Sequence, residues 1–289
     1  MSAEVAAPPA PRGARAPATT PAAATPPVTP APPGHGLTSL GRILRTNRTA
    51  YTKLVRFYRA TARARAADAP VLLEPVLAAA RERSGDVDSV LELGCADGVF
   101  TSWLTREDLA VTAVEFSARM RWAARRRLRA DHAPAGRVTI LPHEFHNGGE
   151  PLPPLAGRRF DVVLAMAFVH LFPAGTDLEV LRQIGRHLTP GGVAFLTTTV
   201  EAQDRRGFER KEGPHGSRVR YRSRYTAASF VELVNLAGLE VRDKQYRVDP
   251  RIEGKTWLDV IVGHPGDALR PARSGPVASL LEASVHGGA

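Results

Sequence analysis

Short apolar segments alternate with helical segments along most of the chain, and this alternation constrains the fold more than any other feature. The expected strands lie at 89–93, 110–115, 138–141, 160–165, 192–199, 239–248 and 257–262. The expected helices between them lie at 99–107, 117–131, 176–188 and 226–237. Runs such as Val162 to Ala165 are apolar at every position, as strands covered on both faces must be. The pattern predicts a doubly wound α/β sheet whose last two strands, with no helix between them, pair as a hairpin.

The two ends of the chain differ in composition from its middle. Residues 1–36 are almost entirely Pro, Ala, Thr and Gly, which bury too little apolar surface to offset the entropy of ordering, so we expect disorder there. Residues 265–289 are similar and are expected to form a flexible tail. The rest suits one domain, with a helical cap over 37–84 ahead of a core over 85–264. The chain has no apolar run of membrane-spanning length, and its single cysteine, Cys95, fits a reducing cytoplasm.

The net charge of +10 at pH 7 is concentrated near the N-terminus. Residues 37–65 contribute +8 with no acidic residue, whereas residues 66–264 together contribute +1. We expect one amphipathic helix in the basic segment, because apolar residues recur there at helical spacing. They are Leu40, Leu44, Tyr51, Leu54, Val55 and Tyr58. A second helix is expected from residue 70 to residue 83.

The segment Val90 to Gly98, VLELGCADG, predicts a strand that runs into a glycine turn and then a helix. Glycine permits a ligand to approach the backbone closely at the carboxyl end of the first strand. The spacing alone suits a nicotinamide dinucleotide as well as S-adenosylmethionine (SAM). Three features favour SAM. Glu92, an acid in an apolar strand, would pair with an ammonium group and repel a pyrophosphate. Glu115 ends the second strand, where it could accept two ribose hydroxyls, and the loop contains no Gly-x-Gly-x-x-Gly.

Taken in order, these segments resemble the class I SAM-dependent methyltransferases over residues 85–264. Val90–Gly98 is similar to their first motif, Phe160–Ala165 to their fourth-strand motif, and Leu188–Gly192 to their Pro-Gly-Gly turn. The resemblance implies a Rossmann-like seven-stranded sheet with an antiparallel last strand, and SAM as cofactor with S-adenosylhomocysteine as product. It assigns Glu115 to the ribose and Glu144 to the adenine amino group. The implied cofactor residues are Glu92, Gly94, Cys95, Ala96, Gly98, Glu115, Phe116, Glu144, Phe145 and Ala165.

Two positions depart from the family pattern. Ala96 stands where glycine is common, a small change that leaves the turn plausible. The segment His143 to Phe145 stands where the family often has Gly-Asp-Ala.

His170 is the candidate general base. A sulfonium already activates the methyl group, so the protein mainly has to align a nucleophile, and a base helps if that nucleophile arrives protonated. His170 follows the fourth strand, in the loop that faces the methyl group in this family, where related sequences often read Val-Leu-His-His. The alternative is that His170 only orders this loop or contacts the cofactor backbone.

The segment Arg218 to Tyr225 alternates strictly and predicts a strand with four guanidinium groups on one face. It belongs to residues 200–225, inserted where related enzymes carry elements that cover the substrate. Arginine forks suit a carboxylate or a phosphate, so Arg222, Arg224 and Tyr225 are candidate substrate residues. The alternative is a solvated edge strand whose charges discourage aggregation.

The basic N-terminal helix also has two interpretations. It could fold over the cofactor as a lid, with Tyr51, Phe57 or Tyr58 touching cofactor or substrate, or it could dock an acidic partner or RNA. We favour the lid, because the apolar face must be buried and an RNA enzyme would carry basic residues throughout its body.

The sequence therefore predicts methyl transfer to O or N of a small molecule. We expect neither a metal site nor a membrane segment. The Ala-, Arg- and Pro-rich composition resembles enzymes of GC-rich bacteria, many of which tailor natural products. The alternatives are an RNA or protein methyltransferase recruited through the basic helix, and a SAM-binding protein without activity.

Overall fold

A computed structural model describes residues 37–134, 136–143, 145, 153–211, 217–249 and 252–266. The predictions for residues 1–36, for 267–289 and for Glu144 lie outside this set. Within it, no helix is both long enough and apolar enough to span a membrane.

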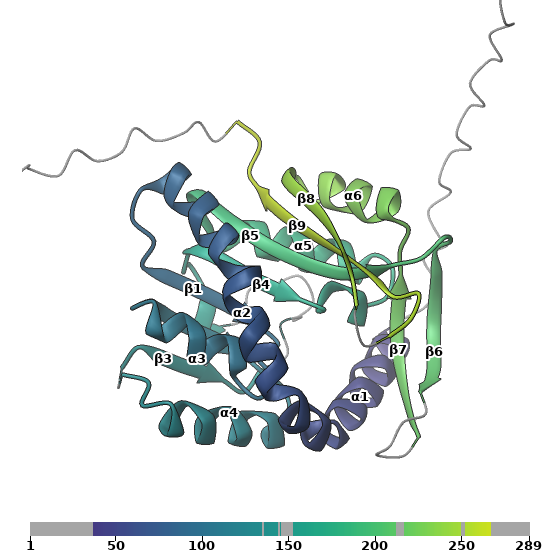
Figure 1. Cartoon of the computed structure of the whole chain (residues 1–289). Coiled ribbons are helices and arrows are strands. Elements are labelled where there is room, and N and C mark those ends of the chain that lie inside the picture. The colour runs from purple at the N-terminus through teal and green to yellow at the C-terminus, as the bar shows by residue number, and fades with distance from the viewer. Residues whose placement is uncertain are drawn as a thin grey trace, which may run out of the picture. The chain divides into compact units, whose positions relative to one another are not determined.

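Seven strands of the described chain form the main sheet, in the order β3-β2-β1-β4-β5-β9-β8 (Figure 1). Their bounds are β1 Ser89–Leu93, β2 Ala110–Val114, β3 Val138–Leu141, β4 Phe160–Met166, β5 Leu188–Val200, β8 Glu240–Val248 and β9 Thr256–Gly263. Strands β1 to β5 are parallel, and β9 is antiparallel to both β5 and β8. This confirms the predicted doubly wound sheet, its antiparallel last strand and the terminal hairpin.

Six α-helices of the described chain accompany the sheet. They are α1 Leu37–Lys53, α2 Val55–Ser84, α3 Val99–Arg106, α4 Ala118–Ala130, α5 Thr176–Arg186 and α6 Ala227–Leu236. Short 3₁₀ turns lie at η1 Pro153–Leu155 and η2 Val169–Leu171. A separate two-stranded sheet joins β6 Arg205–Lys211 to β7 Arg218–Arg224. The predicted helices after β1, β2, β4 and β7 all form, with bounds that differ by one or two residues.

Both faces of the main sheet are buried, which accounts for the uninterrupted apolar runs in its strands. On one face, Val90 and Val162 pack with Leu73 and Leu77 of α2. On the other face, residues such as Leu91 and Val163 pack with side chains of α5 and α6. The carboxyl ends of the parallel strands form one edge of the sheet, between the two helical layers. Ligands bind at this edge in such folds.

The predicted division of residues 40–83 into two helices is wrong in its boundaries. The first helix ends at Lys53, and α2 then runs from Val55 through Pro70 and Pro75 to Ser84. Proline was expected to start a helix there, because an interior proline costs about 3 kcal/mol. Full burial of a Leu or Val side chain is worth about 1.5–3 kcal/mol. Helix α2 buries three such side chains against the main sheet, those of Leu73, Val76 and Leu77. Packing therefore outweighs the local preference.

One buried amide joins three separate segments. The Nδ2 of Asn47 in α1 donates to the carbonyl of Leu171 in η2, at 3.1 Å. Its Oδ1 accepts from the backbone N–H of Tyr221 in β7, at 2.8 Å. The first helix, the turn after β4 and the inserted hairpin are thus fixed to one another.

Candidate active site

The glycine turn lies at the carboxyl end of β1, and its two glycines are required by the chain itself. Gly94 and Gly98 both have a φ of +75°. A Cβ on Gly94 would come within 3.1 Å of the Phe168 ring, and one on Gly98 within 3.0 Å of the Ala124 Cβ. The prediction explained these glycines by the approach of a ligand. The left-handed backbone at both positions, together with the closeness of Phe168 and Ala124, is enough to require glycine there without a ligand.

Glu115 directly follows β2 and holds this turn. Its Oε2 accepts from the backbone N–H of Ala96 at 3.1 Å, and its Oε1 from that of Ser117 at 2.7 Å. The side chain is only 4% exposed, and burial raises its pKa to about 7. The structure therefore brings Glu115 and the turn together, as the spacing of the two motifs predicts.

Glu92 is a second buried carboxylate at this edge, also 4% exposed. The Thr101 hydroxyl donates to its Oε2 at 2.5 Å. Burial raises the pKa of Glu92 to about 7, and the Thr101 hydrogen bond only partly offsets that effect. Neither Glu92 nor Glu115 forms an ion pair within the described chain. Two buried acids without a cation suit a ligand that brings positive charge and hydroxyl donors.

Sequence reasoning missed Asp97, which fixes the turn from two sides. Its carboxylate is buried and accepts from Arg65 of α2 at 3.0 Å and from Arg127 of α4 at 3.1 Å. Arg127 also donates through Nε to the Asp97 carbonyl, at 3.0 Å. An acid inside the turn, with arginine-rich helices on either side in the sequence, was the available signal.

The junction of α1 and α2 lies against the end of β2. The Tyr51 ring meets the Phe116 ring edge-on, with centroids 6.2 Å apart, and the Thr52 and Ser117 hydroxyls are 3.2 Å apart. Tyr58 is on α2, and burial raises the pKa of its hydroxyl. These contacts put Tyr51 next to predicted cofactor residues, whereas Phe57 is exposed.

The turn after β4 holds His170, which is 2% exposed. The Nη2 of Arg222 lies 3.0 Å from its Nε2, and the Thr198 hydroxyl lies 3.4 Å from its Nδ1. Burial, and then the positive charge of Arg222, hold the pKa of His170 well below its usual value. The imidazole is therefore neutral at pH 7. The contact between His170 and Arg222 joins two residues that were predicted separately.

The four arginines of β7 fall into two kinds. Arg222 and Arg218 are 7% and 8% exposed, and each leaves its Nε without a hydrogen bond. Neither forms an ion pair with an acidic residue among those that the structure describes. By contrast, Arg220 and Arg224 pair with Glu209 of β6, and Arg224 also pairs with Glu201. Burial lowers the pKa of Arg222 to about 10. The solvated-edge interpretation thus does not describe Arg222, and the charge of Arg224 is already neutralised.

Four other predicted residues lie in the core. The Tyr225 hydroxyl donates to Asp177 at 2.9 Å, and its ring packs on Phe230. Phe145 is buried against Phe168, and Ala165 is fully buried within β4. Cys95 is buried, and burial raises the pKa of its thiol. Tyr225 is therefore occupied in holding the hairpin to α5.

The family follows from a comparison that covers well over half of the chain. Residues 58–244 match the protein family described as "Methyltransferase domain". The chain belongs to this methyltransferase family. A comparison with curated proteins found no match.

Solved structures agree with the fold of this methyltransferase. A SAM-dependent methyltransferase from Clostridium acetobutylicum has a TM-score of 0.57 at 14% identity, covering 75% of this chain and 99% of that one. The 1,6-didemethyltoxoflavin-N1-methyltransferase of Burkholderia thailandensis has a TM-score of 0.56 at 18% identity, over 80% and 92% of the two chains. The CcbJ methyltransferase of Streptomyces caelestis gives 0.53 at 20%, over 75% and 99%. At such identities the similarity shows the fold.

Proposed function

We propose that this methyltransferase uses SAM to methylate an oxygen or nitrogen of a small, acidic molecule, and that it releases S-adenosylhomocysteine. The cofactor assignment is supported by two buried carboxylates, Glu92 and Glu115, which lie beside the turn at 94–98 and form no ion pair within the described chain. SAM bears an ammonium, a sulfonium and two ribose hydroxyls, so its charge and donors match this acceptor set. The Burkholderia structure named above contains S-adenosylhomocysteine and 1,6-didemethyltoxoflavin, which supports the same kind of reaction here.

Glu115 is assigned to the ribose hydroxyls, because it lies between the glycine turn and the start of α4 and each of its oxygens keeps a second lone pair beyond its backbone hydrogen bond. Glu92 is assigned to the amino-acid part of SAM, where its negative charge would balance the ammonium group. The backbone of 94–98 and the ring of Phe116 complete the contacts. Tyr51 and Tyr58 cover the site as part of the lid that residues 37–65 form.

The acceptor is proposed to bind beside Arg222, with its acidic group on the guanidinium. A buried charge without a partner is costly, and a carboxylate or phosphate on the ligand would remove that cost. Of the two arginines predicted to bind substrate, Arg222 keeps this role. Arg224 instead stabilises the hairpin through Glu201 and Glu209.

His170 is proposed as the base that takes the acceptor's proton. When bound, SAM supplies a methyl group activated by the sulfonium, and the electrons of the broken carbon–sulfur bond return to sulfur. The low pKa of His170 makes it a weak base in the empty site. An anionic acceptor on Arg222 would offset the arginine charge and raise that pKa, so the acceptor would itself activate the base.

The test measures S-adenosylhomocysteine release with pairs of acceptors that differ only in charge, such as a phenolic acid and its methyl ester. We expect turnover with acids and a much higher Michaelis constant for the esters. Equal constants for acid and ester would refute the role of Arg222. Binding of SAM without release of product from any acceptor would instead favour the non-catalytic alternative, and RNA-dependent release would favour recruitment through the basic helices.

A further inference from the structure

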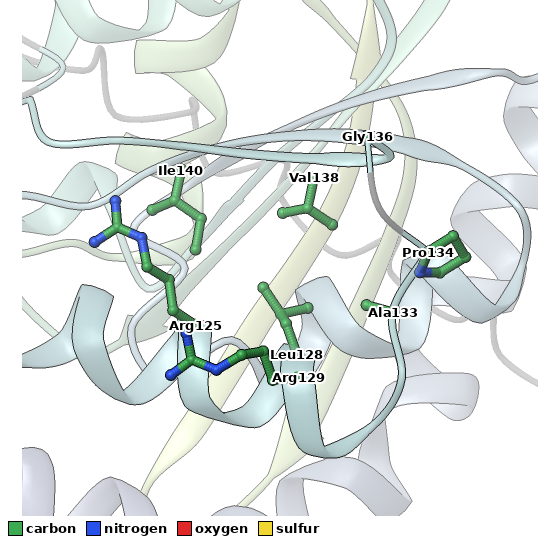
Figure 2. Close-up of a pocket in the computed structure, with 8 residues that line it drawn as sticks. All are labelled: Arg125, Leu128, Arg129, Ala133, Pro134, Gly136, Val138 and Ile140. Carbon is green, nitrogen blue, oxygen red and sulfur yellow. The ribbon is translucent and has the colours of Figure 1, made fainter.

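A cavity of about 240 Å³ lies between α4 and the edge strand β3, on the amino-terminal side of the strand (Figure 2). It is lined by Arg125, Leu128, Arg129, Ala133, Pro134, Gly136, Val138 and Ile140. None of the residues assigned to the cofactor or the acceptor lines it. The volume is below the usual range for drug-sized ligands, so a fragment-sized molecule is the appropriate occupant.

The lining combines apolar walls with two guanidinium groups. Leu128, Val138 and Ile140 supply the walls, and Figure 2 shows Arg125 reaching from α4 toward Ile140. Arg125 and Arg129 are four residues apart, so they project from adjacent turns of one helix face. Within the described residues, neither guanidinium group forms a hydrogen bond or an ion pair. An apolar floor beneath two guanidinium groups matches a ligand with a short apolar body and one anionic end.

The surrounding charge also favours an anion. Helix α4 contains six arginines and no acid. Burial lowers the pKa of Arg121 on the same helix, and the positive charges of Arg125 and Arg48 lower it further. This reveals mutual repulsion among arginines of α4 and α1, which the charge totals along the sequence did not indicate. An anion between Arg125 and Arg129 would reduce that repulsion.

We propose that this cavity binds a small amphipathic anion, a carboxylate or phosphate on a short alkyl or aryl body, and that its occupancy strengthens cofactor binding. The coupling passes through α4. Arg121 donates to the carbonyls of Glu115 and Phe116, both at 2.8 Å, and Arg127 holds Asp97. Helix α4 therefore carries part of the cavity lining and also the arginines that hold the end of β2 and the glycine turn. Binding at the cavity is independent of the proposed function, whereas the coupling rests on it.

The experiment uses the full-length protein and three probes: octanoate, its uncharged counterpart octan-1-ol, and acetate. Calorimetry measures the affinity of each for the wild type and three variants. Arg125→Gln/Arg129→Gln removes both cavity charges, and Ala133→Phe fills the cavity while leaving them. Arg119→Gln/Arg126→Gln is the matched control, since it removes the same charge from α4 outside the cavity lining.

We expect octanoate to bind at least tenfold more tightly than octanol or acetate. Its affinity should fall at least tenfold in the first two variants and stay unchanged in the control. Equal loss in the control would reduce the effect to general charge attraction and overturn the proposal, as would absence of octanoate binding to the wild type. Saturating octanoate should raise the affinity for S-adenosylhomocysteine at least twofold in the wild type only. Octanoate binding without that change would overturn the coupling, and failure of S-adenosylhomocysteine to bind at all would count against the proposed function.

Discussion

Replacing Arg222 by methionine should raise the stability of the unliganded protein and weaken the binding of an acidic acceptor. The folded protein lowers the pKa of Arg222 to about 10, which corresponds to a penalty of about 3 kcal/mol on the charged form. The substitution also removes the hydrogen bonds to His170 and Thr199, each worth about 1 kcal/mol net. The balance is a gain of about 1 kcal/mol. Replacement of buried ions by apolar side chains often has this sign.

Thermal unfolding of the unliganded protein measures the first half of this prediction. A gain of about 1 kcal/mol should raise the midpoint by about 2–4 °C. The second half is kinetic: loss of a charge-assisted hydrogen bond of about 1.5–3 kcal/mol should raise the Michaelis constant of an acidic acceptor by about ten- to a hundredfold.

Arg224→Met is the control, because Arg224 is neutralised by Glu201 and Glu209. It should lower stability, by about 1 kcal/mol at most for partly exposed pairs, and leave the acceptor's Michaelis constant unchanged. An unfolding midpoint of the Arg222→Met variant well below that of the wild type would refute this prediction. Such a result would make Arg222 a structural link between β7 and the turn after β4.

Three further predictions address the rest of the site. His170→Ala should lower kcat by about a hundredfold or more with little change in the acceptor's Michaelis constant, whereas equal kcat values would make His170 structural. In the folded protein the pKa of Glu92 and that of Glu115 are about 7, above the ordinary value of a glutamate. Both carboxyl groups of the unliganded protein therefore stay protonated up to about neutral pH. Cationic SAM binds their charged forms, so calorimetry should show its affinity rising from about pH 6 to about pH 8. Glu115→Gln should weaken SAM about tenfold or more and flatten this rise, and an unchanged pH profile would remove Glu115 from the site. Asp97→Asn should cost about 3 kcal/mol in urea unfolding, since it leaves two arginines without their buried partner. Asp108→Asn, at an exposed pair, should cost less than about 1 kcal/mol.

The sequence predicted the elements whose signals are local. Strand positions followed from apolar runs, and the β1 turn followed from its glycines, so the sheet and its order of helices were accessible. Glu115 was predicted because it ends the second strand, where an acid can accept both ribose hydroxyls. The exception was α2, where two prolines give a strong local signal that tertiary packing overrides.

The pairings within the site were not accessible, because they depend on residues far apart in the chain. Nothing near His170 indicates that Arg222, on an inserted strand, would contact it. The alternation of β7 predicted four arginines on one face, but which of them meet an acid depends on the register with β6 and Glu209. Asp97 was missed for the same reason, since its partners come from two different helices.

The buried amide of Asn47 limits how such an enzyme could be redirected to another acceptor. It joins α1, η2 and β7, so the hairpin that carries Arg222 is not an independent module. A hairpin grafted alone from a relative would keep the bond to Asn47 only if its backbone N–H at position 221 stayed in register, and its side chains would not be matched to the surface of α1. Engineering of acceptor choice should therefore exchange residues 37–53 and 205–224 together, as one recombination block.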